Sequence, residues 1–435
     1  MFQVFRNAWK IDELRKKILY TAMIILVFRI GCAIFVPFLD TSQIQNMLSG
    51  SENTLLGFMN TMTGGALGNG TLFAMSITPF INASIIMQLL TVAIPALERL
   101  SKEGDEGRKK INKITKFLAL GIGMFQAVAF YITLVNNNAV QYTDGFDGFL
   151  AMITIVGCFT AGASLIIWLG DQISEKGIGN GISIILFAGI VSRLPIDIWG
   201  LIQQMRVTDT GGVQNYVLVP VYLVIYIAMI ALVVLMTNAE RRIPVQYAKR
   251  VVGRKMYGGQ SSHIPIKVAM AGVMPIIFAM SIMSLPSTIL FFFQIDRTST
   301  GFWGSFLRVF NEGSWLYAVI YFFMIIGFNY FYISIQYNPI EIANNLKKNN
   351  GAIPGYRPGK PTSDFIHNSL SKVTLIGAMF LGFIAIFPII FSNVTGIHGM
   401  AMGGTTMLIM VGVSLETMRS LEGQMMMRHH KGFLE

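Results

Sequence analysis

The sequence is poor in charged residues and in cysteine. Only 13% of its 435 residues are charged and 53% are hydrophobic, whereas a soluble domain carries roughly 25% charged residues. This deficit excludes a soluble enzyme and a disordered chain. The two cysteines, Cys32 and Cys158, both lie in apolar runs and provide neither a disulfide framework nor a metal site. A membrane protein with many spans is the class that remains.

Signatures of catalysis are also missing. The sequence has no H-E-x-x-H motif, no G-x-x-x-x-G-K-[ST] motif and no matched Ser–His or paired-Asp set within its apolar stretches. The pair His429 and His430 in the tail is more typical of a solvated basic end than of a metal site. We therefore expect no enzymatic activity, no cofactor and no metal.

Ten apolar stretches are long enough to cross a bilayer, which takes about 20 residues. We expect an all-α polytopic protein whose first span is retained, because no A-x-A-like cleavage site follows it. The stretches are 18–38, 74–96, 117–135, 149–169, 178–200, 216–237, 268–292, 314–336, 373–391 and 402–418.

The basic residues orient these spans. If the N-terminus is cytoplasmic, the inner segments hold 28 of the 33 lysines and arginines and the outer segments hold four, and Arg29 lies inside the first span. This asymmetry follows the positive-inside rule and favours an even number of spans. Both termini are therefore expected on the cytoplasmic side.

Two inner loops, 238–267 and 337–372, are each about 30 residues long, which is more than a connection needs. Both are basic and are punctuated by proline, glycine and tyrosine. One interpretation is a basic loop resting near anionic headgroups. We favour the other, a loop that holds a shape.

The two halves of the sequence repeat each other. The segment 79–89 matches 275–285 at an offset of 196, with Pro, Ile, Ala, Met and Leu coinciding, and 181–189 matches 404–412 at an offset of 223. Five spans per half is an odd number, so the second half enters the membrane from the opposite side. The pattern predicts an inverted-topology repeat, with an N-terminal half at 1–205 and a C-terminal half at 206–435.

Inverted repeats place the functional pathway at their interface, marked by short or interrupted spans. Span 178–200 contains Arg193 and Pro195, and spans 74–96 and 402–418 carry polar residues near their repeat-matched segments. Small polar residues that help helices pack explain some of these. Their concentration in the matched spans favours a pathway.

The segment 54–74 between the first two spans is uncharged and apolar but is broken by glycines. Irregular backbone at membrane depth survives only inside protein or beside a water-filled cavity. We expect a short re-entrant helix at about 56–72 that acts as a plug, with an interfacial helix on the outer leaflet as the alternative. The plug residues that we single out are Leu56, Phe58, Met59, Gly64, Gly65, Leu67 and Gly68.

Aliphatic residues face the expected interface. A constriction that they line can block ions by dewetting, although ordinary core packing is the simpler interpretation of their spacing alone. These residues are Ile81, Ile85, Ile182, Leu186, Ile277 and Ile409.

Four stretches in order along the chain resemble the SecY family of protein-conducting channels, bacterial branch. They are Pro79–Leu90, Gly177–Ile185, Glu240–Arg250 and Ile353–Gly359. The sequence departs from the family at Ser76, where Gly is usual, and at Leu186, where Ile is common. The first departure puts only the local backbone in doubt, and the second keeps the aliphatic character.

The resemblance implies the central channel subunit of the Sec protein translocase, a multi-pass protein of the bacterial plasma membrane. It would pass unfolded secretory chains through a ring formed by the six aliphatic residues above. It would also release apolar segments through a lateral gate between the second and seventh spans. The gate residues are Ile86, Gln88, Leu89, Ile282 and Leu285.

The resemblance also implies partners. They are the membrane subunits SecE and SecG, the motor ATPase SecA, the ribosome, signal peptides and the bilayer, with no direct nucleic-acid role beyond ribosome docking. Contacts with the motor or the ribosome would fall on Arg241, Arg242, Lys249, Arg250, Arg254, Lys255 and Arg357.

A secondary transporter of a small solute is the alternative, because it shares inverted repeats and broken helices. Such transporters usually need intramembrane carboxylates or histidine for ion coupling. The expected spans hold almost none, and the one that we single out is Glu416, near the cytoplasmic end of the last span.

Overall fold

The computed structural model describes residues 2–49, 60, 62–204, 212–247, 250–252, 255–257, 261–292, 314–395 and 404–429. Within these residues each of the ten expected spans falls on a helix. The ten helices are α2 (Asp12–Gly31), α5 (Thr78–Ala93), α7 (Asp105–Asn136), α8 (Gly145–Lys176), α9 (Gly181–Gln204), α10 (Gly212–Asn238), α11 (Met274–Phe292), α13 (Trp315–Gln336), α15 (Lys360–Thr395) and α16 (Gly404–His429).

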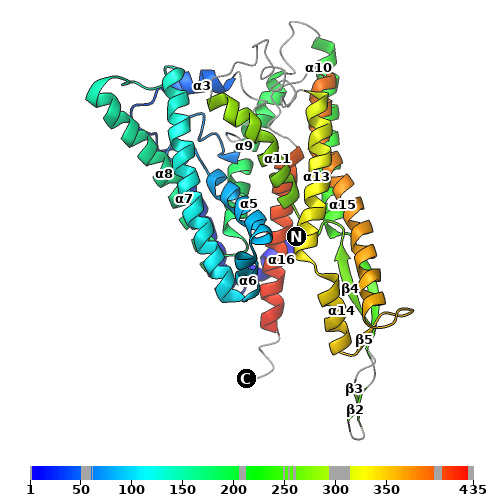
Figure 1. The fold of residues 1–435 in the computed structure, drawn as a ribbon. Helices are drawn as coiled ribbons and strands as arrows, with labels where there is room; N and C mark the ends of the chain where they lie inside the picture. The colour runs from blue at the N-terminus through cyan, green and yellow to red at the C-terminus, as the bar shows by residue number, and fades with distance from the viewer. Residues whose placement is uncertain are drawn as a thin grey trace.

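Shorter elements lie at the two ends of this bundle. Figure 1 shows α3 at one end, and α6, α14, the β-strands and the C-terminus at the other, which we call the loop end. The shorter elements are α1 (Phe2–Trp9), α3 (Thr41–Ser49), α6 (Pro95–Lys102), α14 (Pro339–Lys348), β1 (Glu240–Tyr247), β2 (Arg250–Val252), β3 (Lys255–Tyr257), β4 (Ser261–Lys267) and β5 (Gly351–Ala352).

Six helices among the described residues are long and apolar enough to cross a membrane by themselves, and seven if a bent pair counts as one span. The bent pair is α5 and α6, which meet at 101° where Ile94 precedes Pro95. The residue before a proline is pushed out of the α region, and Ile94 is extended at φ −108° and ψ 112°. Span 74–96 therefore ends sooner than expected.

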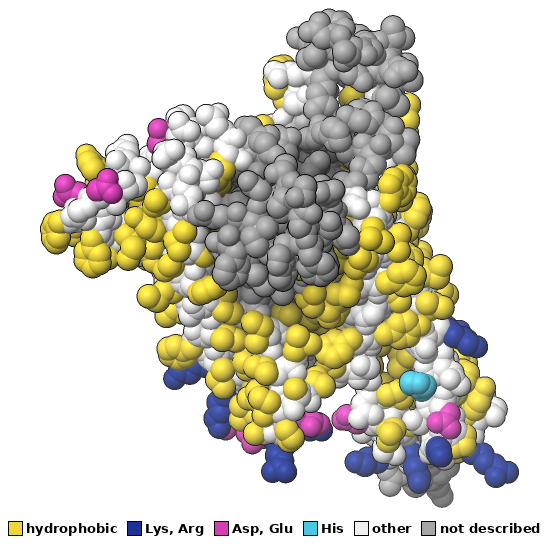
Figure 2. All heavy atoms as spheres, turned by 45° about the horizontal axis from the view of Figure 1, so that its top comes forward, with side chains coloured by type: hydrophobic (Ala, Val, Ile, Leu, Met, Phe, Trp, Pro, Cys, Tyr) yellow, Lys and Arg dark blue, Asp and Glu magenta, His cyan; other side chains and the backbone are white. Residues whose placement is uncertain are grey.

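The space-filling view separates apolar from basic surface. Figure 2 shows hydrophobic side chains in a broad band across the visible face and most Lys and Arg along its lower edge, over the loop end. An apolar belt with a basic rim is the surface of a protein that sits in a bilayer.

The helix boundaries follow both sequence repeats. Helices α5 and α11 begin at Thr78 and Met274, which are 196 residues apart, and α9 and α16 begin at Gly181 and Gly404, which are 223 apart. In Figure 1, α5 runs toward the loop end and α11 runs away from it. The repeat-matched helices therefore start in register and point in opposite directions, as an inverted repeat requires.

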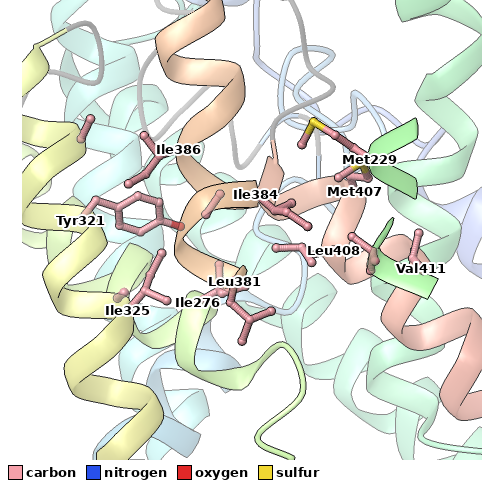
Figure 3. Packing of buried hydrophobic residues seen from close by; sticks show 14 of the residues in the cluster. Met229, Ile276, Tyr321, Ile325, Leu381, Ile384, Ile386, Met407, Leu408 and Val411 are labelled. Carbon is pink, nitrogen blue, oxygen red and sulfur yellow. The ribbon is translucent and has the colours of Figure 1, made fainter. Parts of the chain in front are cut away.

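Among the described residues, the three largest clusters of buried apolar residues lie one in each half and one between them. One cluster joins α10, α11, α13, α15 and α16, with Tyr321, Ile384 and Leu408 among its members (Figure 3). A second packs α7 and α8 against the segment 36–75. The third, described below as the central cluster, draws on α2, α5, α8, α9, α11 and α16.

The loop 238–267 folds into strands. In the three-stranded sheet the order is β4-β1-β5, with β1 antiparallel to β4 from Glu240 opposite Lys267 to Gln246 opposite Ser261. Ile243, Val245 and Ile266 are buried against α14 and α15. The alternating burial along β1 explains why a polar-looking loop has a fixed shape.

Two expected spans have bounds that differ clearly from those of the helices on which they fall. The first, 18–38, was placed too late, since α2 begins at Asp12 and ends at Gly31. Asp12 and Glu13 lie in the first turn of α2, where their negative charge interacts favourably with the positive end of the helix dipole. The ninth, 373–391, is too short, because α15 begins at Lys360 inside the second long loop.

The interruption expected in span 178–200 is wrong. Helix α9 runs from Gly181 to Gln204 with Pro195 inside it. Proline removes one backbone hydrogen bond, and membrane helices tolerate it where neighbouring groups satisfy the freed carbonyl.

The departure from the family at Ser76 lies just before α5, at a backbone position that favours glycine. Ser76 has φ +50°, a left-handed backbone that favours glycine. It is buried, and its hydroxyl has no hydrogen-bond partner within the described residues. Serine here combines backbone strain with an unpaired polar atom.

We expect Ser76→Gly to stabilise the protein by about 1 kcal/mol, because it relieves the left-handed strain and removes the orphaned hydroxyl. Thermal unfolding in detergent measures the change. Ser76→Ala is the matched control, since it removes the hydroxyl but keeps the strain, and its gain should be smaller. A lower melting temperature for Ser76→Gly would contradict the prediction.

Candidate pore and gate

Five of the six ring residues lie in the central cluster. Leu186 and Ile409 are buried members, at 5% and 1% exposure, and Ile81, Ile182 and Ile277 pack against it half-buried. They come from α5, α9, α11 and α16, the two pairs of repeat-matched helices. Ile85, the sixth, is buried one turn after Ile81 on α5 but is not among the members of the cluster.

The ring has a simple chemistry. Its side chains are aliphatic, so they offer no hydrogen bond to any passing group and no site that prefers one ion. An opening lined by such groups dries out and blocks ions when it is narrow. The arrangement fits a soft seal better than a selective filter.

The plug segment lies against the ring. Met62 and Ala66 belong to the same central cluster as Leu186 and Ile409. Leu67 is fully buried and belongs to the N-terminal-half cluster, with Ile44 and Phe159. Of the plug residues from the sequence, Leu56, Phe58 and Met59 lie outside the described residues.

The described part of the plug is mostly turns rather than the expected helix. The chain is helical at Asn60 and Met62 and turns from Thr63 onward. Gly64 and Gly65 have φ of +67° and +89°, which end a right-handed helix. The Asn60 side chain accepts a hydrogen bond from the Gly68 amide at 2.9 Å and so closes the turns.

Two arginines near the plug have partners that the sequence did not predict. Arg29, taken to be mid-span, lies in the last turn of α2 and donates to the Gly64 carbonyl at 3.3 Å. Arg193 of α9 pairs with Asp197 at 3.3 Å. Asp197 also lies within span 178–200, which adds a second acidic residue to the expected spans beside Glu416.

The gate residues lie on α5 and α11. Ile86 and Leu89 are exposed at 40% and 36%, and Gln88 donates to Ser84 one turn earlier at 3.4 Å. Ile282 is half-buried, and the side chain of Leu285 lies outside the described residues. Helix α5 packs closely on α7, and α11 packs closely on α13. The two gate helices thus have different packing neighbours, with apolar side chains left exposed on α5.

The basic residues of the two long loops lie at the loop end. Arg241 and Arg242 are exposed on β1, where Arg242 pairs with Glu240 at 2.7 Å. Arg357 is exposed in the turn before α15, and its carbonyl accepts from the Thr362 hydroxyl at 2.8 Å. That turn is fixed further by Tyr356, whose ring lies 4.3 Å from Phe365.

The remaining basic residues are only partly described. Arg250 and Lys255 lie on the paired strands β2 and β3, and their side chains are outside the described residues. Lys249 and Arg254 lie outside the described residues altogether.

Two ion pairs lie at the loop end, one within α6 and one between α7 and α8. Lys102 donates to Glu98 on α6 at 2.6 Å, and this bond holds the pKa of the Glu98 carboxyl below its usual value. Lys116 of α7 and Asp171 of α8 pair at 2.6 Å. Within the part of the chain that the structure describes, no group of His, Cys, Asp or Glu could hold a metal ion.

These features agree with what known proteins show. A family model described as SecY matches residues 71–418. The chain belongs to the SecY family. The protein translocase subunit SecY of Streptomyces scabiei is 39% identical over the full length of both chains. That of Thermotoga maritima is 40% identical over 100% of this chain and 98% of its own.

Solved structures share the fold. A protein-conducting channel superposes with a TM-score of 0.61 at 19% identity, covering 94% of this chain and 91% of that one. A SecY protein, whose plug domain stabilises the closed state of its channel and maintains a membrane seal, gives 0.63 at 20% identity over the same shares. Sec61 from a canine ribosome–channel complex gives 0.58 at 18% identity, also covering 94% and 91%. The all-α SecY fold and a multi-pass membrane protein are therefore established for this chain.

Proposed function

We propose that this chain is the central channel subunit of a Sec protein translocase. It passes unfolded polypeptides across the membrane and releases apolar segments sideways into the bilayer. The observation that carries the proposal is the central cluster, in which ring side chains from four repeat-matched helices and the plug residues Met62 and Ala66 pack together. The halves that meet there are 1–205 and 206–435.

The chemistry of the ring suits this substrate. An unfolded chain presents every kind of side chain in turn, so a fixed set of polar ligands would retain some and reject others. Aliphatic side chains contact all of them weakly and close again when the chain has left. Such a seal blocks ions by excluding water.

A sideways exit between α5 and α11 is consistent with how those two helices pack. Ile86 and Leu89 present exposed apolar surface on α5, to which an apolar signal sequence binds through burial of its own surface. Gln88 bonds within its own helix, so it does not tie α5 to α11.

The loop end supplies the docking face. Energy must come from a partner, since the sequence holds no P-loop motif. We propose that SecA or a ribosome binds the basic loop from Arg241 to Lys255 and the turn at Arg357, and that SecE and SecG bind within the membrane. This places both termini in the cytoplasm and the chain in a bacterial plasma membrane. The ribosome-bound relatives Sec61 and Ssh1 support the docking assignment.

A solute transporter is less well supported. Its coupling site would need membrane carboxylates free to bind an ion. Of the two that the described spans contain, Asp197 is paired with Arg193 and Glu416 lies on α16 away from the ring, beyond Ile409 by about two helical turns.

Cross-linking to a stalled secretory chain tests the pore directly. A photo-reactive residue at Ile277, which packs on the central cluster, should label the translocating chain strongly. The matched control is the adjacent Phe278, which is fully buried against Phe328 and Tyr332 and should label it weakly. Equal labelling at both positions, or labelling at neither, would contradict the pore assignment.

A charge reversal tests the docking face. Arg357→Glu should lower motor-driven export about tenfold, because it places a like charge where a complementary one is needed, while the protein still assembles in the membrane. Lys347→Glu, equally exposed at the end of α14, is the matched control and should export normally. Full export by Arg357→Glu would remove the docking assignment.

A further inference from the structure

Two side chains at the end of α2 contact consecutive backbone carbonyls of the plug. The Arg29 guanidinium donates to the Gly64 carbonyl at 3.3 Å, and the Cys32 thiol lies 3.9 Å from the Thr63 carbonyl. Residues three apart share one face of a helix, so both side chains project from α2 toward the same turn. Among the described residues, no carboxylate pairs with Arg29.

Helix α9 holds the same turn from another side. A Cβ added at Gly189 would overlap the Met62 carbonyl, and a Cβ added at Gly64 would overlap the Ser192 hydroxyl and come within 2.8 Å of Arg29. Gly64 also has a left-handed backbone that only glycine adopts without strain. The plug backbone is therefore packed between α2 and α9 with no room for a side chain.

We propose that Arg29 and Cys32 form a latch that holds the plug closed, and that this latch sets how readily the channel opens. The proposal rests on the proposed function and adds to it the positioning residues that fix the closed state. Both contacts go to backbone oxygens rather than to plug side chains. The latch therefore depends on the shape of the turn at Gly64 and not on the identity of the other plug residues.

The charge on Arg29 gives the latch its strength. A hydrogen bond from a guanidinium to a carbonyl is stronger than a neutral one, and an arginine near the membrane is costly to leave without an acceptor. When the plug leaves, the guanidinium loses the Gly64 carbonyl and must be solvated by water in the opening. Arg29 is itself exposed over part of its surface, so we expect a moderate rather than an absolute effect.

Resting ion flux through the purified protein in liposomes measures the latch. Arg29→Gln should raise the flux about tenfold, equivalent to about 1.4 kcal/mol on the opening equilibrium. Arg15→Gln is the matched control, because it removes an arginine from the first turn of the same helix, where Arg15 pairs with exposed Asp12. Its flux should equal that of the unmodified protein. A flux for Arg29→Gln as low as for Arg15→Gln would overturn the latch.

A second variant changes the plug instead of α2 and leaves Arg29 in place. Gly64→Ala should also raise resting flux, since its Cβ displaces the turn from Ser192 and Arg29. This variant keeps the test decisive if Arg29→Gln is poorly produced. A tight Gly64→Ala channel would contradict the close packing that the latch requires.

A disulfide between Cys32 and the plug distinguishes a wrong latch assignment from a wrong plug assignment. Thr63→Cys introduces a thiol into the residue whose backbone carbonyl lies 3.9 Å from the Cys32 thiol. Oxidation to a disulfide with Cys32, checked by thiol counting, should lock the turn and stop export, and reduction should restore it. Thr63→Ser, which keeps the hydroxyl bonded to Asn60 and adds no thiol, is the control and should export under both conditions. Export that continues through the locked protein would contradict the plug and hence the proposed function. A lock that blocks export while Arg29→Gln stays tight would contradict the latch alone.

Discussion

The structure depends on one apolar contact, the central cluster where α5, α9, α11 and α16 meet. A passage for unfolded chains must be wide when it opens and closed to ions when it rests. Polar groups at its narrowest point would either leak or bind. Under the proposed function, the residues that meet both demands, by excluding water without recognising a substrate, are Ile81, Ile182, Leu186, Ile277 and Ile409.

The inverted repeat explains how one chain builds such a contact. Helices that start 196 and 223 residues apart bring equivalent turns to the same depth from opposite directions, so each half supplies similar side chains to a shared seam. Each half also keeps a buried core of its own. Under the proposed function the halves separate at the seam without unfolding, and the plug, whose residues Met62 and Ala66 pack in the central cluster, fills the space between them.

The apolar pattern predicts the bounds of a helix well where the helix is about as long as the bilayer is thick. Span 314–336 matches α13 within one residue. It fails where helices continue into water, as α7 and α15 do, because hydropathy measures the apolar part of a helix and not its hydrogen-bonded length. It also fails at Pro195, where tertiary packing keeps α9 intact.

The candidate site was predictable to the extent that it follows repeat spacing. Ile81 and Ile277 occupy equivalent positions, and spacing alone pairs them. The contact of Arg29 with Gly64 was not predictable, since it joins residues 35 apart through a backbone oxygen that no sequence pattern marks. The turns at Gly64 and Gly65 replaced an expected helix for a related reason: glycine permits both, and the surrounding helices select one.

The proposed function requires that the seal lies in the central cluster and not in the buried core as a whole. Leu408 and Ile409 are neighbours on α16, both nearly fully buried, but Leu408 packs in the C-terminal-half core and Ile409 in the central cluster. An asparagine at either position buries an amide and costs about 1–3 kcal/mol. Resting ion flux in liposomes should rise for Ile409→Asn and stay at the basal level for Leu408→Asn. Equal flux through both variants would contradict a seal at this cluster.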